Sequence, residues 1–157
     1  MSDSLRLRPA RPDDYDFLIE LTYRLADFEI PPWRSREEIA AIEHAPIRLA
    51  LAEPDPDLGL IVAEQVPGGE RLGYAMLLTQ RDFFTGEKHA HLSILAVRRE
   101  AEGRGVARAL LEATDDWARE RGLPFITLTV FHANVRARAL YERLGWQPDT
   151  RRYRKEL

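Results

Sequence analysis

The stretch from residue 98 to residue 108, RREAEGRGVAR, holds the residues best suited to bind a charged ligand. Gly103 and Gly105 precede a segment with helical periodicity, and glycines at a helix N-terminus leave backbone N–H groups open to an anion. The same stretch contains four arginines that could pair with phosphate oxygens: Arg98, Arg99, Arg104 and Arg108. It lacks the Gly-Lys-Ser/Thr of nucleotide-hydrolysing loops, and Arg108 stands where a dinucleotide-binding loop has its third glycine. Two interpretations stay open: a phosphate-binding loop, or a tight turn with solvated arginines.

Tyr141 and His91 are two side chains whose types could move a proton. Tyr141 lies four positions after Ala137 and three before Leu144, so its ring is expected on the core side of a helix. A neutral tyrosine hydroxyl can donate a hydrogen bond or a proton to a leaving group. His91 follows His89 by two positions on the same face of a predicted strand, and histidine titrates near neutral pH. The alternatives are a buried core tyrosine and a partly exposed strand histidine.

Composition limits the class of protein. The chain has 157 residues, 45% hydrophobic and 31% charged, which indicates one soluble globular domain over residues 1–157. It has no cysteine, which excludes disulfides, thiolate metal ligands and a thiol nucleophile. Four scattered histidines predict no metal site, and a net charge of −3 predicts no general attraction to nucleic acid. Because residues 1–10 contain no apolar core and no run is long enough to cross a membrane, we expect a cytoplasmic protein.

Apolar periodicity and turn residues predict an alternating series of strands and helices. We expect strands near 5–8, 60–64, 72–79, 91–97 and 125–131, and helices near 12–28, 35–44, 104–121 and 134–144. The segment 47–52 suits either a strand or a helix, and Tyr153–Leu157 could form an edge strand. The strand, helix and strand over residues 91–131 form a right-handed crossover, which makes those two strands parallel neighbours. The fold class is therefore α/β (mixed α+β) with a mixed sheet.

Two motifs resemble those of the GCN5-related N-acetyltransferase (GNAT) superfamily. The segment Glu102–Ala107, EGRGVA, is similar to the family's acetyl-CoA loop, Arg/Gln-x-x-Gly-x-Gly/Ala, and departs from it at Glu102. The segment 134–146, NVRARALYERLGW, looks like the family's N-x-x-A-x-x-L-Y-x-x-x-G-F pattern. The resemblance implies a central sheet that is mostly antiparallel, flanked by helices, with one parallel strand pair that splays apart to admit the cofactor.

The resemblance also implies an activity and a set of site residues. It implies direct attack of an amine on the thioester of acetyl-CoA, with Tyr141 as the acid for the leaving thiolate. The implied cofactor-binding residues are Leu95, Ala96, Val97, Gly103, Arg104, Gly105, Val106, Ala107, Arg108 and Asn134. Within this set, the backbone of 95–97 would bind the developing oxyanion, and Asn134 also fits a helix N-cap.

The sequence specifies the proton acceptor and the amine-binding site less closely than the cofactor site. His91 is the first candidate to deprotonate the amine, with Glu64 or an ordered water as alternatives. We expect the first two helices, the loop at 27–33 and the segment 82–85 to shape the acceptor site. Acids mixed with aromatics suit a cationic amine, so we expect Glu29, Trp33 and Phe84 there. Trp33 and Phe84 could equally seal the core.

Two other functional classes stay open. A non-catalytic acyl-CoA-binding or sensing domain would keep the glycine loop without needing Tyr141. A nucleic-acid binder would use the arginines near the C-terminus, against the negative net charge. For the enzyme, we expect a small-molecule or protein amine as partner and neither nucleic acid nor membrane, and a homodimer is compatible with the sequence.

Overall fold

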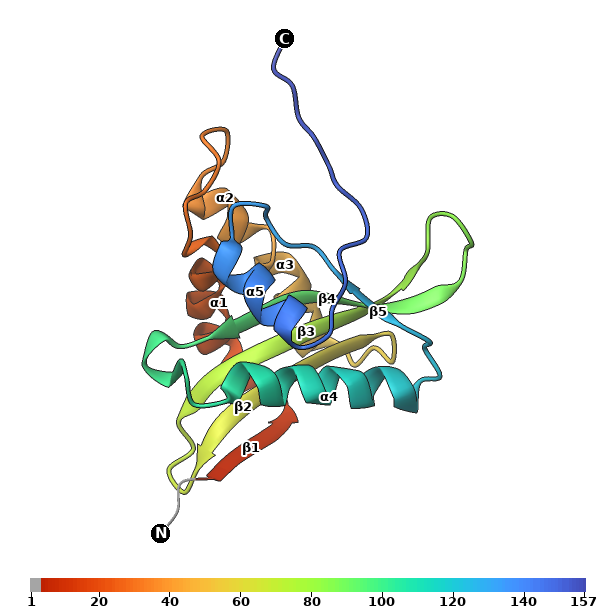
Figure 1. Cartoon of the computed structure of the whole chain (residues 1–157). Helices are drawn as coiled ribbons and strands as arrows, with labels where there is room; N and C mark the ends of the chain where they lie inside the picture. Colours follow the sequence, from red (N-terminus) through yellow and green to blue (C-terminus); the bar gives the residue numbers. More distant parts are fainter. Residues whose placement is uncertain (1–3) are drawn as a thin grey trace.

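The computed structural model describes residues 4–157, which fold into one sheet with helices on both faces (Figure 1). The strands are β1 (Ser4–Pro9), β2 (Leu58–Val66), β3 (Arg71–Arg81), β4 (Lys88–Val97) and β5 (Ile126–Leu128). The helices are α1 (Tyr15–Thr22), α2 (Arg36–Ala41), α3 (His44–Ala52), α4 (Val106–Glu120) and α5 (Val135–Arg143). Three short 3-10 turns, η1 (Pro12–Asp14), η2 (Tyr23–Ala26) and η3 (Arg99–Ala101), connect them.

The strands follow one another in the order β1-β2-β3-β4-β5, and this arrangement confirms the predicted fold class. Neighbouring strands from β1 to β4 pair antiparallel. In contrast, β4 and β5 are parallel, because α4 makes the crossover between them. One core lies between the sheet and α4, around Leu110 and Trp117. A second core lies on the opposite face, where α1 and α3 pack around Leu18 and Ile47. Figure 1 shows α4 across one face and α1 and α3 behind the sheet.

The parallel strands separate after a short paired region, as expected. β4 and β5 are in register only from Ala90 opposite Ile126 to Leu92 opposite Leu128, yet β4 continues to Val97. On the other side of β4, the register with β3 shifts so that Ser93 is an extra residue, a β-bulge. The bulge bends β4 at the point where β5 ends. The β4 edge from Ser93 to Val97 is therefore unpaired with β5.

Several predicted elements differ in the structure. The helix expected at 12–28 is divided into η1, α1 and η2, and α2 ends at Ala41. The ambiguous segment 47–52 belongs to helix α3, whose first turn contains Pro46, where a proline is tolerated. β5 stops at Leu128, earlier than expected. Residues 153–157 form no strand, because the tail is exposed and has no apolar face to bury; Figure 1 shows it leading away from the sheet.

A buried carboxylate ties β1 to the start of α1. Asp14 is completely buried and accepts hydrogen bonds from the Arg8 guanidinium (2.8 and 2.9 Å), from Arg71 Nε (2.5 Å) and from the Arg11 backbone N–H (2.7 Å). Burial by itself would raise the pKa of Asp14, but these hydrogen bonds outweigh it and lower the pKa to about 2. The folded state therefore holds Asp14 ionised.

We predict that Asp14→Asn lowers the free energy of unfolding by about 1.5–3 kcal/mol, because Arg8 and Arg71 lose the buried charge that they share and Arg8 keeps only Glu64. Asp13→Asn, in the same turn but with its side chain 73% exposed, should change it by less than about 0.5 kcal/mol. Because the folded pKa is the lower one, the Asp14 contribution is complete above the unfolded pKa of 3.8 and is lost as the pH falls toward 2. Urea titrations of both variants and the wild type measure this, and equal effects of the two substitutions would contradict it.

Candidate active site

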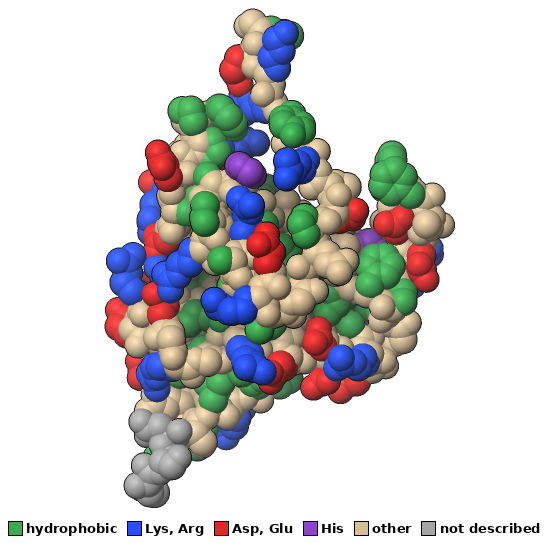
Figure 2. Space-filling view, in the orientation of Figure 1, with side chains coloured by type: hydrophobic (Ala, Val, Ile, Leu, Met, Phe, Trp, Pro, Cys, Tyr) green, Lys and Arg blue, Asp and Glu red, His purple; other side chains and the backbone are tan. Residues whose placement is uncertain are grey.

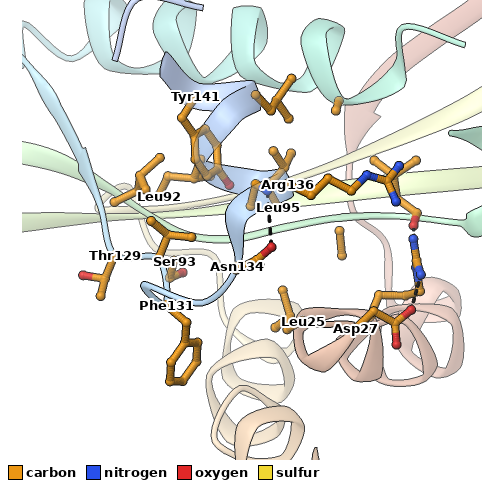
Figure 3. A pocket seen from close by; sticks show the side chains of 18 of the residues that line it. Leu25, Asp27, Leu92, Ser93, Leu95, Thr129, Phe131, Asn134, Arg136 and Tyr141 are labelled. Atoms are coloured by element: carbon orange, nitrogen blue, oxygen red, sulfur yellow. Dashed lines mark hydrogen bonds and ion pairs between the residues drawn. The ribbon is translucent and has the colours of Figure 1, made fainter. Parts of the chain in front are cut away.

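A cavity of about 1460 Å³ opens where β4 and β5 diverge (Figure 3). One wall is the end of β4 together with the loop that leads into α4, and a second wall is α5. The third wall comes from η2 and α2, with Leu25, Ile39 and Ile42. The cavity therefore joins the predicted glycine loop to η2 and α2, which belong to the first two helices that the sequence predicts.

The glycine loop leaves the start of α4 open toward this cavity. Gly103 and Gly105 have left-handed backbones, with φ of 74° and 80°, which glycine adopts without a side-chain penalty. Gly105 is the N-cap of α4, and no side chain caps the helix there. A Cβ atom at either glycine would meet nothing within 4 Å. The first amides of α4, from Val106 onward, thus form an uncapped helix N-terminus at the cavity, which is suited to bind an anion.

The four arginines of this loop do not converge on one point, contrary to expectation. Arg98 donates to the Arg71 carbonyl (2.9 Å), and Arg99 pairs with Asp27 (3.0 Å). Arg104 donates to Gln65 Oε1 (2.7 Å) and is not among the residues that line the cavity. Arg108 lines it but pairs with Glu112 one helical turn away (3.0 Å). Each guanidinium already has a protein partner, so the anion preference of the loop depends mainly on its amides.

Glu102, which departs from the family motif, is neutralised by two arginines. It accepts hydrogen bonds from Arg136 on α5 (2.6 and 3.1 Å) and from Arg24 on η2. These hydrogen bonds, that of Arg136 foremost, lower the pKa of Glu102. Arg24 also pairs with Asp27 and donates to the Val97 carbonyl (3.1 Å). Glu102 and its partners therefore connect all three walls of the cavity; Figure 3 labels Arg136 and Asp27, the two ends of this chain of ion pairs.

Asn134 and Tyr141 lie on the wall formed by α5. Asn134 Oδ1 accepts a hydrogen bond from the Ala137 N–H (3.2 Å), which confirms the predicted N-cap. Tyr141 lines the cavity, and its ring packs against Trp146 at 5.8 Å between centroids. Its hydroxyl makes no hydrogen bond to any residue of the described part of the chain. Burial raises the pKa of Tyr141 to about 12, so the hydroxyl stays protonated and can donate.

His91 is positioned on β4 by Thr127 of the neighbouring β5. His91 Nδ1 lies 2.8 Å from Thr127 Oγ1, and His89 Nε2 lies 3.1 Å from the same oxygen. His89 is buried and stacks on Phe125, whereas His91 is half-buried and lines the cavity. Burial and the nearby His89 lower the pKa of His91. His91 is therefore neutral at pH 7 and has one nitrogen not engaged by Thr127.

Glu64, the alternative proton acceptor, is placed elsewhere. It is 3% exposed on β2 and accepts hydrogen bonds from Arg6 and from Arg8 Nε, the latter at 2.7 Å. Hydrogen bonds from these arginines lower its pKa. Glu64 does not line the cavity, so its role is structural. Between residues 4 and 157, no group of three or more histidine, aspartate or glutamate side chains could hold a metal ion.

The three residues expected at the acceptor site are not among those that line the cavity. Glu29 is exposed, Trp33 is 46% exposed with Arg154 over its ring at 5.2 Å, and Phe84 is 81% exposed between β3 and β4. Trp33 and Phe84 do not seal the core either. The residues that do line this region include Leu25, Ile39, Ile42, Glu43 and Phe131. The sequence predicts that the first two helices shape this site, but the three-residue spacing of Ile39 and Ile42 does not distinguish a cavity wall from a core face.

Two further structural findings bear on location and on the nucleic-acid alternative. Within residues 4–157, the helices are too short or too polar for a membrane span. On the face that Figure 2 shows, basic and acidic side chains alternate, without one continuous basic patch. Arg136 is paired with Glu102, and Arg154 with Glu156.

A mixed sheet that opens between two parallel strands, with an uncapped helix N-terminus beside the opening, is the architecture expected of an acyl-CoA-dependent transferase. Residues 20–146 match the model of the acetyltransferase (GNAT) family, and the chain belongs to this family. The resemblance inferred from the two sequence motifs is thereby confirmed.

Individual relatives agree with this assignment. The chain is 39% identical to a mycothiol acetyltransferase of Beutenbergia cavernae over 94 residues, which are 60% of this chain and 30% of that protein. It is 33% identical to the mycothiol acetyltransferase of Propionibacterium freudenreichii over 93% of this chain and 44% of that protein. The chain thus spans less than half the length of these two relatives. An aminoglycoside N-acetyltransferase in complex with CoA has the same fold, with a TM-score of 0.74 at 18% identity over 100% of this chain and 98% of that one.

Proposed function

We propose that this chain is an acetyl-CoA-dependent N-acetyltransferase, in which an amine attacks the thioester directly. The observation that carries the proposal is the uncapped N-terminus of α4, open to the same cavity that Tyr141 and His91 line. A non-catalytic acyl-CoA-binding domain would use the same loop, but it would leave the half-buried, protonated Tyr141 hydroxyl without a role. We place the protein in the cytoplasm, and its acceptor is a small-molecule or protein amine.

The residues present fit acetyl-CoA. The amides from Gly103 to Arg108 would hold its diphosphate, because Gly103 and Gly105 leave space where a side chain would stand. The unpaired β4 edge, which includes Leu95, Ala96 and Val97, offers backbone groups to the pantetheine arm and the thioester carbonyl. Asn134 keeps its side-chain N–H₂ free, since only its oxygen caps α5. When bound, acetyl-CoA supplies an activated acyl carbonyl and a thiolate leaving group.

Tyr141 acts as the proton donor to the leaving sulfur. A thiol has a pKa of about 8.5, so a hydroxyl with a higher pKa stays protonated until a thiolate forms beside it. Burial raises the pKa of the Tyr141 hydroxyl to about 12, which keeps its proton in place but makes full transfer to a thiolate less favourable. The hydroxyl therefore stabilises the leaving sulfur first as a hydrogen-bond donor.

His91 takes the proton from the incoming ammonium group. A primary alkylammonium has a pKa of about 10.4, so nearly all of the amine is protonated at pH 7 and must lose a proton before attack. The lowered pKa of His91 keeps its ring neutral and able to accept. For its second nitrogen to accept, Nδ1 must carry the ring hydrogen and donate to Thr127 Oγ1. Thr127 is thus a positioning residue for His91.

The first test addresses the amide loop. Alanine at Gly105 must adopt a left-handed backbone at a cost of about 1–2 kcal/mol, so the loop is expected to rotate its amides out of position. We predict that Gly105→Ala weakens CoA binding about tenfold, or about 1.4 kcal/mol, in calorimetry. Gly86→Ala is the matched control, because Gly86 has the same left-handed backbone and open surroundings in the β3–β4 turn. No CoA binding by the wild type would refute the proposed function.

The second test addresses Tyr141. We predict that Tyr141→Phe lowers kcat at least about tenfold, at the lower end of what general acids contribute, without changing the KM for acetyl-CoA. Tyr153→Phe in the tail, where the side chain is 83% exposed, should leave both constants unchanged. Steady-state kinetics at the pH optimum measure this. A kcat within twofold of the wild-type value, with chemistry limiting, excludes Tyr141 as the acid.

The third test addresses His91. The base must be neutral, so kcat/KM should decline as the pH falls through the His91 pKa, which lies below its ordinary 6.5. We predict that His91→Gln removes this acidic limb and reduces kcat/KM at pH 7. His132→Gln, at an exposed position, serves as the control. If the pH profile and rate of His91→Gln match those of the wild type, water removes the proton instead.

A further inference from the structure

Four carboxylates line the cavity, and three of them have partners within the protein. Asp27 accepts hydrogen bonds from three arginines, with that of Arg36 at 2.8 Å. Glu102 is shared between two arginines. Glu38 accepts from the Ser35 backbone N–H (2.8 Å) and so completes the capping box that starts α2. These three charges are explained by the fold itself.

The fourth carboxylate, Glu43, has no such explanation. Among the described residues it accepts no hydrogen bond and forms no ion pair, although it is half-buried. Glu43 occupies the N-cap position of α3, yet its side chain does not cap that helix. Burial raises its pKa, which means that the structure partly desolvates this charge without compensation. A partly buried carboxylate without a partner is costly to retain unless something else binds it.

The surroundings of Glu43 define what that partner would be. Leu25, Ile39 and Ile42 line the same part of the cavity wall and present apolar surface. Phe131, three residues beyond the end of β5, also lines the cavity, and its ring lies 5.1 Å from that of Phe28 between centroids. This side of the cavity therefore combines apolar surface with one carboxylate that no protein group pairs with, and the combination is complementary to a cation that carries an apolar substituent.

No cationic side chain within residues 4–157 forms an ion pair with Glu43. Arg24 is engaged by Asp27 and Glu102. Arg34 lines the cavity from the loop before α2 but forms no ion pair with Glu43 or with any other acid of residues 4–157. His44, the next residue in the chain, lies 3.1 Å from Thr22 Oγ1 through its Nε2. The charge of Glu43 is therefore available to a ligand.

We propose that Glu43 binds the ammonium group of the acceptor and makes the site selective for a primary alkylamine with an apolar body. This inference rests on the proposed function, because the amine must be bound in the cavity that receives acetyl-CoA. Glu43 holds the amine in its protonated form, and His91 takes the proton afterwards. Glu43 is thus a specificity-determining residue, distinct from the groups that move protons.

The experiment compares two isomeric amines at pH 7.5. Phenethylamine is a cationic alkylamine at this pH, whereas 4-ethylaniline has the same atoms but is uncharged. Glu43→Gln keeps the shape of the side chain and removes its charge. Glu37→Gln is the matched control, because Glu37 lies on the preceding helix α2 but is exposed and outside the cavity. Calorimetry measures amine binding to the CoA complex, and steady-state kinetics measure KM and kcat.

We expect Glu43→Gln to weaken phenethylamine binding and to raise its KM at least about tenfold, as loss of a partly buried ion pair implies. Constants for 4-ethylaniline should change less than twofold, and the Kd for CoA should not change. The proposal is overturned if Glu43→Gln and Glu37→Gln affect phenethylamine equally, or if the wild-type CoA complex binds no cationic amine. In both cases intact CoA binding leaves the proposed function standing. If the wild type binds no CoA, the proposed function fails and this inference fails with it.

Discussion

The divergence of β4 and β5 is the constraint on which the rest of the site depends. Parallel strands normally continue their hydrogen bonds along their shared length, but here pairing ends at Leu92 and Leu128. The extra residue Ser93 bends β4 at that point, and an unpaired strand edge results. Buried backbone groups need partners, so such an edge is stable only when water or a ligand meets it. The sheet therefore creates a binding surface by leaving its own hydrogen bonds incomplete.

Ion pairs hold the walls of this opening together. Glu102 joins the glycine loop to α5 through Arg136 and to η2 through Arg24, and Arg24 continues the chain to Asp27. The family motif places arginine or glutamine where this chain has Glu102. Here the acidic side chain binds arginines from the other walls, so the net charge beside the loop is not negative. The departure from the motif is thus compensated by residues far away in the sequence.

Local patterns predicted much of the fold and one side of the site. The crossover from β4 through α4 to β5, the glycine loop, the Asn134 cap and the position of Tyr141 all follow from periodicity or from motifs within residues 91–146. What could not be predicted depends on contacts between distant segments. The arginines of the loop turned to Gln65, Asp27 and other partners, and the tail formed no strand, because tertiary neighbours decide where a charged side chain points. Trp33 and Phe84 had suitable chemistry, but their exposed loops place them away from the cavity.

On the acceptor side, the partners of each acidic side chain are more informative than its position in the sequence. Asp27, Glu38, Glu43 and Glu102 look alike in the sequence, as acids near helix ends. Only the structure separates those whose charge is used by the fold from the one whose charge is not. A fold tolerates a partly desolvated carboxylate when the energy is recovered in another state of the protein, and binding of a cation is such a state. Selectivity for the amine thus arises at the junction between α2 and α3, whereas recognition of the acyl donor arises at the start of α4.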